Sequence, residues 1–144
     1  MNSVNPWSRY RQVATQTASP GQLVLMLYDG ALGFLERSLQ GFEMEDPGEM
    51  NEAIGNNILK AQAILEELDR SLDMSVEGGF SETMRGLYGY MDRKLFESNM
   101  RKEPEGIREV VERLTVIRDA WREMLQQEGI LPGVERALPV GMAG

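Results

Sequence analysis

The side chains best suited to chemistry in this chain are its carboxylates, which gather at 66–69, 109–112 and 119–123. Paired carboxylates can serve as general acid and general base. Several of them, however, have an arginine one helical turn away, and this spacing is typical of ion pairs on a solvated helix face. The pairs expected on this basis are Glu66 with Arg70 and Glu109 with Arg113. We therefore interpret the clusters as helix surfaces.

Two residue types that carry much of protein chemistry are missing. The chain contains no His and no Cys, so the usual nucleophilic triads cannot be built and no disulfide can form. No phosphate-binding or dinucleotide-binding glycine pattern is present. We predict a protein that is not an enzyme, with no catalytic residues, no metal and no cofactor. An all-helical enzyme would need charges on the apolar seams, where Arg118, between Ile117 and Trp121, is the nearest candidate.

The length and net charge of the chain narrow the classes of function and partner that remain. With 144 residues the chain fits a single domain that can bury a real core. Its net charge of −8 argues against nucleic acids and anionic membrane surfaces as partners. Residues 1–10 lack the apolar region of a signal peptide, and no run approaches the ~20 apolar residues of a membrane span. We expect a cytoplasmic protein that binds no nucleic acid and does not insert into membranes.

The stretch 17–35 is the most informative in the chain. Ser19, Pro20 and Gln22 have the order of a capping box with proline at the first helical position. Six apolar or aromatic residues follow without interruption at 23–28. A bundle helix that buries one stripe needs only three or four apolar positions in two turns. This helix is therefore either wrapped on all sides by the bundle, or it keeps one face for a partner.

Apolar periodicity predicts four helices, at 20–42, 47–72, 81–100 and 104–127. The second carries a heptad seam of Ile54, Ile58, Ala61, Leu65, Leu68 and Leu72. The connections are short, so sequential helices should be antiparallel neighbours. We predict an all-α fold, an antiparallel up-down four-helix bundle with a short N-terminal capping arm. The expected divisions are the arm at 1–18, the bundle at 19–128 and a flexible tail at 129–144.

The sequence has more adaptable apolar surface than a closed bundle needs. It contains ten Met residues, and Met recurs at surfaces that accept helices because it packs into irregular shapes. Tyr88 and Tyr90 are two residues apart on one helix and cannot face the same core. Trp7 and Tyr10 place costly aromatic surface in the arm. Each feature alone fits core packing, but together they favour a groove that accepts an amphipathic helix.

Four sequence patterns, in order along the chain, resemble those of the flagellar secretion chaperone family FliS. They are Tyr10 with the runs 15–20 and 23–31, the segment 60–73, the segment 78–99, and Trp121 with the preceding Val110 and Leu114. Three residues depart from the family pattern. Gly21 stands where a helix-favouring or charged residue is expected, and Phe80 where a polar or smaller one is usual. Gly89 stands where an Asp is common. The chain after Gln127 has no counterpart, so nothing transfers to it.

The resemblance implies a cytoplasmic export chaperone that holds the C-terminal segment of flagellin in a hydrophobic groove. Such a protein would prevent premature polymerisation and deliver flagellin to the flagellar export apparatus, whose components would be further partners. The alternative is a helical-bundle regulatory protein that sequesters a motility or transcription regulator in the same groove. The residues predicted to bind the partner are Tyr10 in the arm and, in the groove, Leu27, Tyr28, Leu65, Leu68, Tyr88, Met91 and Phe96.

Overall fold

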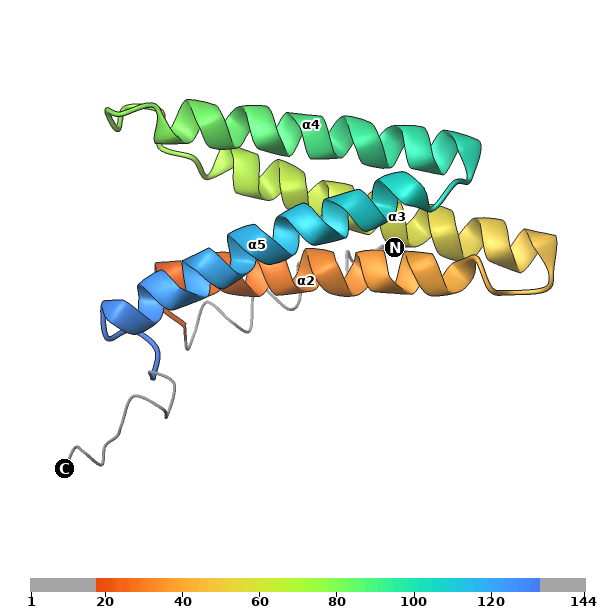
Figure 1. The fold of residues 1–144 in the computed structure, drawn as a ribbon, viewed down its shortest axis with the longest axis horizontal. Coiled ribbons are helices and arrows are strands. Elements are labelled where there is room, and N and C mark those ends of the chain that lie inside the picture. Colours follow the sequence, from red (N-terminus) through yellow and green to blue (C-terminus); the bar gives the residue numbers. More distant parts are fainter. Residues whose placement is uncertain (1–17, 133–144) are drawn as a thin grey trace, which may run out of the picture.

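The structure, a computed structural model, describes residues 18–132. Its helices there are α2 (Pro20–Gly41), α3 (Pro47–Arg70), α4 (Phe80–Arg101) and α5 (Glu105–Gln127). Successive helices run in opposite directions, and α5 crosses the bundle at an angle (Figure 1). Each helix packs against its sequence neighbour, and α5 also packs against α2, which closes the ring. The predicted all-α antiparallel bundle is confirmed; the predicted capping arm lies outside the described residues, apart from its last residue.

Local side-chain bonds fix where α2 and α3 begin. The Ser19 backbone N–H donates to Gln22 Oε1 (2.8 Å), and the Gln22 N–H donates to Ser19 Oγ (3.2 Å), which is the predicted capping box. Asp46 Oδ2 accepts from the Glu49 N–H (2.9 Å), and Pro47 takes the first helical position. Both predicted helix starts are therefore confirmed.

The connection between α3 and α4 is longer than the sequence predicts. Helix α3 ends at Arg70, because the Leu72 N–H bonds to the Asp69 carbonyl oxygen (3.2 Å) in a tight turn. Helix α4 begins at Phe80, one residue before its predicted start, after Gly79 with a φ of 80°. Glycine adopts this left-handed conformation without the steric cost that other residues bear, and the chain can therefore turn directly into α4.

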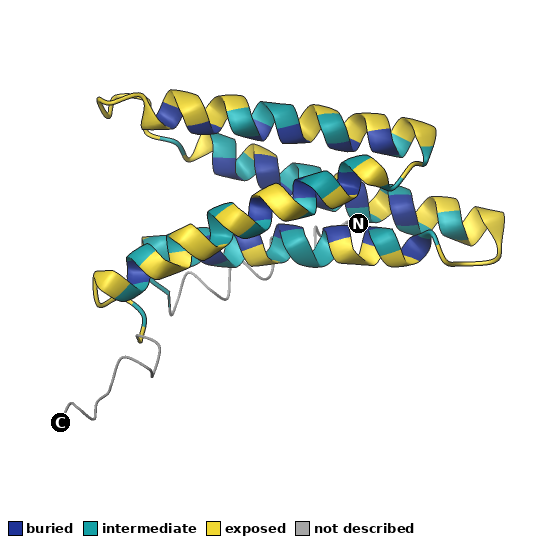
Figure 2. Cartoon of the chain, in the orientation of Figure 1, coloured by how far each residue is buried: buried dark blue, intermediate teal, exposed yellow. Residues whose placement is uncertain are grey.

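The core is a continuous apolar layer between the four helices. The predicted seam of α3 is confirmed, because all its members are buried except Leu72, which is half-buried at its end. In α4, Tyr88 is buried and Tyr90 is only partly buried on another face, as their spacing predicts. Figure 2 shows buried residues facing the interior along the helices and exposed residues facing outward. Each helix therefore buries one main stripe.

Two kinds of feature are absent from residues 18–132. No helix in this range combines the length and the apolar character that crossing a bilayer requires. The same range contains no group of acidic side chains placed to hold a metal ion.

Gly106 lies in a tight contact between two helices, whereas Gly86 faces open space. A Cβ at Gly106 of α5 would overlap Ser98 Oγ of α4 and lie 3.3 Å from the Lys94 carbonyl oxygen, whereas a Cβ at Gly86 would meet no atom within 4 Å. We expect Gly106→Ala to lower the free energy of unfolding by about 1–3 kcal/mol. We expect Gly86→Ala to raise it by about 1 kcal/mol, because alanine favours a helix. Urea unfolding measures both, and equal effects would contradict the close packing of α4 on α5.

Candidate functional site

An apolar groove opens at the end of the bundle where α2 and α4 begin and α3 and α5 end. Its volume is about 210 Å³. The apolar and aromatic residues that line it are Val24, Tyr28, Leu68, Leu72, Val76, Phe80, Tyr88 and Trp121. All four helices and the connection 71–79 contribute to this lining, so the groove exists only once the bundle has assembled. We call this surface the apolar groove.

The rim of the apolar groove leaves apolar surface in water. The side chain of Phe80 is 56% exposed and that of Val76 is 50% exposed. Along the run 23–28 of α2, the bundle buries Leu25 and Tyr28, while the other residues are half-buried. The described helices therefore do not wrap α2 on all sides, and one face of its first turns remains partly uncovered. Apolar surface gathered beside a concave opening is typical of a binding site.

The hydroxyl groups of Tyr28 and Tyr88 meet inside the bundle. Their oxygens are 2.7 Å apart, and both side chains are buried. Burial raises the pKa of both hydroxyls, and the neighbouring Tyr28 raises the pKa of Tyr88 further. Both groups therefore stay protonated at neutral pH, one donating and the other accepting. This bond joins α2 to α4 and holds both rings in the lining of the apolar groove.

Trp121 closes the groove from the side of α5. Its Nε1–H donates to the carbonyl oxygen of Gly21 (2.9 Å) at the start of α2. Gly21 also permits the approach of α5, because a Cβ at this position would lie 2.7 Å from Leu125 Cδ2. The beginning of α2 is thereby fixed to the end of α5, and this contact determines how far apart two walls of the groove stand.

The connection 71–79 forms the outer wall. Ser81 Oγ–H donates to the Asp73 carbonyl oxygen (2.7 Å). The Asp73 carboxylate accepts from the Ser75 hydroxyl (2.6 Å) and the Ser75 backbone N–H (3.0 Å). These two hydrogen bonds, the hydroxyl one first, lower the pKa of Asp73. Together the bonds give the connection a defined shape that presents Val76 at the rim.

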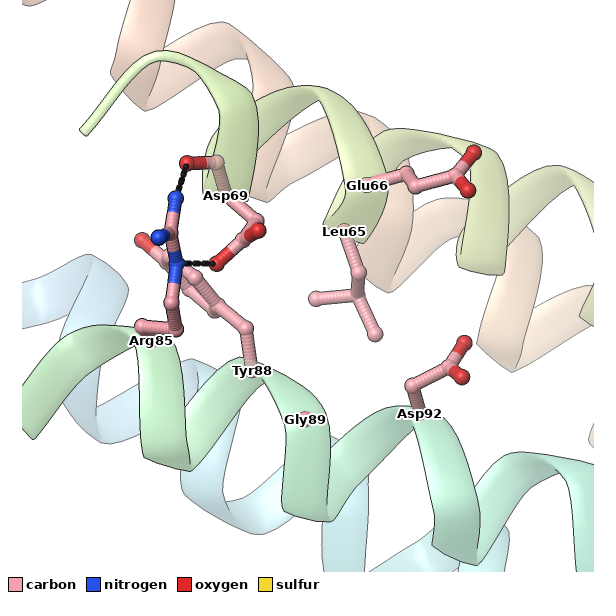
Figure 3. Close-up of a pocket in the computed structure, with 7 residues that line it drawn as sticks. All are labelled: Leu65, Glu66, Asp69, Arg85, Tyr88, Gly89 and Asp92. Carbon is pink, nitrogen blue, oxygen red and sulfur yellow. Dashed lines mark hydrogen bonds and ion pairs between the residues drawn. The ribbon is translucent and has the colours of Figure 1, made fainter. Parts of the chain in front are cut away.

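A second cleft, of about 230 Å³, lies between α3 and α4 (Figure 3). Its lining residues are Leu65, Glu66, Asp69, Arg85, Tyr88, Gly89 and Asp92. Arg85 Nε lies 3.0 Å from Asp69 Oδ1 and closes one end, while Glu66 and Asp92 lie at the other end. We call it the α3–α4 cleft. Tyr88 lines both this cleft and the apolar groove, so its side chain forms the wall between them.

The predicted partner-binding residues lie in different surroundings. Three line the apolar groove: Tyr28, Leu68 and Tyr88. Four lie elsewhere in the described structure: Leu65 in the α3–α4 cleft, Met91 in the core, Leu27 half-buried against the core and Phe96 exposed on α4. Tyr10 lies outside the described residues. The structure thus brings three of the eight together, and contact of any of them with a partner stays a prediction.

Sequence reasoning missed residues that form the walls of the groove. It assigns Trp121 to a helix stripe and gives Val24 and Val76 no role of their own. Val76 carries no periodic signal because it lies in a connection between helices. For Phe80 a signal was present, since an aromatic residue directly after Gly78 and Gly79 departs from the family pattern. That departure corresponds to the most exposed of the large apolar residues that line the groove.

The charged clusters contribute surface ion pairs. Arg113 Nε lies 2.9 Å from Glu109 Oε2, which confirms the predicted pair. Arg70 pairs with Glu67 at 3.1 Å, so the predicted partner Glu66 is wrong. One turn of helix places both Glu66 and Glu67 within reach of this arginine, and the geometry of the spacing alone does not choose between them.

Arg118, the candidate charge for an all-helical enzyme, bridges two helices at the surface. Its Nε lies 2.7 Å from Asp29 Oδ1 of α2, and its Nη1 lies 3.0 Å from Asp119 Oδ1. These hydrogen bonds, that to Asp29 first, raise the pKa of the guanidinium group. Arg118 therefore supports the packing of α5 on α2, beside the apolar groove that the same two helices help to form.

The amino-acid sequence was compared with models of known protein families and with known proteins. The family model described as Flagellar protein FliS matches residues 3–128, which include all four helices. The chain belongs to the FliS family. The flagellar secretion chaperone FliS of Bacillus subtilis is 38% identical to this FliS family member over 124 residues, which cover 86% of this chain and 89% of the relative. The FliS chaperone of Escherichia coli is 33% identical over 119 residues, covering 82% and 85%. That of Salmonella typhimurium is 35% identical over 112 residues, covering 77% and 80%.

The tyrosine pair can be tested by a double-mutant cycle. Tyr28→Phe or Tyr88→Phe leaves one buried hydroxyl without its partner, so we expect each single variant to lower the free energy of unfolding by about 1–3 kcal/mol. The double variant leaves no orphaned hydroxyl, and its loss should be smaller than the sum of the single losses. Denaturant unfolding of all four proteins gives the coupling. Strict additivity would show that the two hydroxyls do not interact.

The same pair predicts a pH dependence in the alkaline range. Because the folded protein raises the pKa of both hydroxyls above the unfolded value of about 10, it keeps protons that the unfolded chain loses. The stability contributed by this effect is present below pH about 10 and is lost as the pH rises above it. We expect the free energy of unfolding to fall more steeply there for the natural protein than for Tyr28→Phe/Tyr88→Phe. Parallel profiles would refute this assignment.

Proposed function

We propose that this FliS family member is a non-enzymatic cytoplasmic export chaperone that binds the C-terminal segment of flagellin in the apolar groove. It would prevent premature polymerisation and deliver flagellin to the export apparatus. The observation that carries the proposal is the uncovered groove, where Phe80 and Val76 keep about half of their surface in water. The curated relatives are named flagellar secretion chaperones, and a chaperone of this kind needs an apolar surface for cargo that has not yet assembled.

The shape and chemistry of the groove suit an amphipathic helix. Trp121 and Phe80 lie on two different helices and offer large aromatic surfaces, the side chains that most often anchor protein interfaces. A helix laid in such a groove presents apolar residues at every third or fourth position. A disordered segment that folds there loses conformational entropy, and the apolar area that it buries offsets this cost. This explains why the groove is concave and apolar yet open.

We propose that the contacts to the cargo come from the groove residues Val24, Val76, Phe80 and Trp121, together with the predicted Tyr28, Leu68 and Tyr88. Leu65 and Met91 do not line the groove, so we assign them the support of α3 and α4 rather than direct contact. Leu27 is half-buried on α2 and would contribute at the edge of the same surface.

We propose the division of the chain into an arm at 1–18, a bundle at 19–128 and a tail at 129–144. Residue 18 lies two residues before the first residue of α2, the helix that carries Val24 of the groove. Tyr10 is eight residues before residue 18, and eight residues of fully extended chain reach roughly 26 Å. Trp7 and Tyr10 of the arm can therefore cover the apolar groove in the absence of cargo and leave it when flagellin binds.

Calorimetric titration of the full chain with a peptide from the C-terminal segment of flagellin tests this function. We expect binding with a dissociation constant of tens of micromolar or lower. Phe80→Ser should weaken it about tenfold or more, because the cargo loses an aromatic anchor. Val116→Ser is the matched control, since Val116 is an exposed apolar residue of α5 outside the groove lining.

Two results would overturn the proposal. One is the absence of heat of binding at tens of micromolar peptide with a folded protein. The other is equal weakening by Phe80→Ser and Val116→Ser, which would place the contacts outside the groove. Capture of a motility or transcription regulator in place of flagellin from a motile cell would instead support the regulatory alternative.

A further inference from the structure

Exposed apolar side chains also gather away from the apolar groove, on the outer side of α3 and α4. Leu59 of α3 is 58% exposed, and on α4 Phe96 is 58% and Met100 is 70% exposed. None of the three lines the apolar groove or the α3–α4 cleft. The bundle core therefore does not account for them, and leaving three large apolar side chains in water needs another explanation.

The pairing of α3 with α4 places these residues on one surface. Gln62 Nε2 of α3 lies 3.1 Å from Asp92 Oδ1 of α4. A second contact joins Asp69, seven residues after Gln62 on α3, to Arg85, seven residues before Asp92 on α4. Helical residues at a spacing of three or four share a face. Leu59 is three residues before Gln62, and Phe96 is four residues after Asp92, so both continue the same line of contacts. The α3–α4 cleft lies on this line.

Two carboxylates stand beside the cleft on the same surface. Figure 3 shows Glu66 and Asp92 on the side of Leu65 that faces away from the Asp69–Arg85 pair. Among residues 18–132 neither carboxylate forms an ion pair, and Asp92 accepts only a hydrogen bond from the neutral Gln62. Their negative charges are therefore available to a cation from outside.

Gly89 leaves the α3–α4 cleft open between Tyr88 and Asp92. It lines the cleft on α4, and a Cβ there would meet only Arg93 Nη1, at 3.6 Å. The glycine is thus not required by the packing of α3 on α4. A side chain from outside can enter at this point, reach Leu65 with its apolar part and place a positive charge near Glu66 and Asp92.

We propose that this surface, which we call the α3–α4 face (Leu59, Glu66, Gly89, Asp92, Phe96 and Met100), is a second docking surface that binds a basic amphipathic helix of a protein other than the flagellin cargo. The apolar residues of that helix pack on Leu59, Phe96 and Met100. Its Lys or Arg enters the α3–α4 cleft. From Phe96 to Gly89 is seven residues, roughly 10 Å along a helix, so apolar and basic positions in the partner lie two turns apart.

Charge favours such a partner over a second copy of this chain. Two copies with a net charge of −8 repel each other on average, and like charges at a contact oppose association. A basic helix instead meets two unpaired carboxylates next to exposed apolar surface. The long stems of Lys and Arg suit this combination, because they cover apolar surface while the charged end reaches a carboxylate.

The test uses the full chain and two designed helical peptides. The basic peptide carries two leucines one turn apart and two lysines two turns further along, and the acidic peptide replaces the lysines by glutamates. Amide chemical shifts map the binding surface during titration. We expect the basic peptide to shift the amides of the α3–α4 face, and to bind at least about tenfold more tightly than the acidic one, with an affinity that falls as salt is added.

Variants on the exposed surface separate the charge from the apolar contact. Glu66→Lys/Asp92→Lys should weaken binding of the basic peptide about tenfold and improve binding of the acidic one. Leu59→Gln/Phe96→Gln should weaken binding of both peptides. The matched controls are Glu112→Lys and Val116→Gln on α5, which change an exposed charge and an exposed apolar residue away from this face. Neither control should alter the affinity.

Several outcomes would overturn this inference. One would be that the two peptides bind equally, that neither binds, or that the shifts map to the apolar groove. Another would be a dimer in sedimentation that Leu59→Gln/Phe96→Gln dissociates, which would make a second copy the occupant. A third would be a loss of affinity for the flagellin peptide in the same variants, which would assign the face to the cargo. Unchanged flagellin binding in these variants supports a separate partner, and failure of flagellin to bind at all leaves the peptide result standing on its own.

Discussion

The hydroxyl groups of Tyr28 and Tyr88 bond to each other across the bundle, and this bond joins α2 to the diagonally opposite helix α4. A buried hydroxyl must keep a partner, so the two rings are held in one arrangement. That arrangement matters beyond the core, because both rings line the apolar groove and Tyr88 also lines the α3–α4 cleft. A displaced Tyr88 would merge two cavities whose chemistry differs, one lined by aromatic and aliphatic residues and the other flanked by carboxylates.

The fold follows from signals that are local in the sequence. The caps at Ser19 and Asp46 each involve residues within one turn, the seam of α3 is a repeat along a single segment, and the structure confirms all three. The candidate site does not follow in this way. Its walls come from residues as far apart as Val24 and Trp121, which periodicity treats as separate helix stripes. Met91 illustrates this limit: periodicity places it on the apolar stripe of α4, but only the assembled bundle shows that it is fully buried in the core.

Departures from the family pattern prove to be informative positions. Gly21 weakens α2 as an isolated helix, but it admits Leu125 of α5 and its carbonyl oxygen binds Trp121. Gly89 leaves the α3–α4 cleft open, and Phe80 stands exposed at the rim of the apolar groove. In each case local preference yields to a contact or an opening that only the assembled bundle possesses. Sequence reasoning can identify such a departure, but the neighbour that explains it comes from a distant part of the chain.

Exposed apolar surface promotes the association of a protein with itself, and carboxylates lie beside both openings of this bundle. Asp73 lines the apolar groove, and Glu66 and Asp92 flank the α3–α4 cleft. When two copies approach through the same face, these carboxylates meet their own counterparts, and the repulsion opposes apolar contact. A partner with a neutral or basic apolar face meets no such barrier. If the two proposed docking functions hold, these acidic residues would favour a foreign helix over a second copy of the chain beside the exposed Phe80 and Phe96.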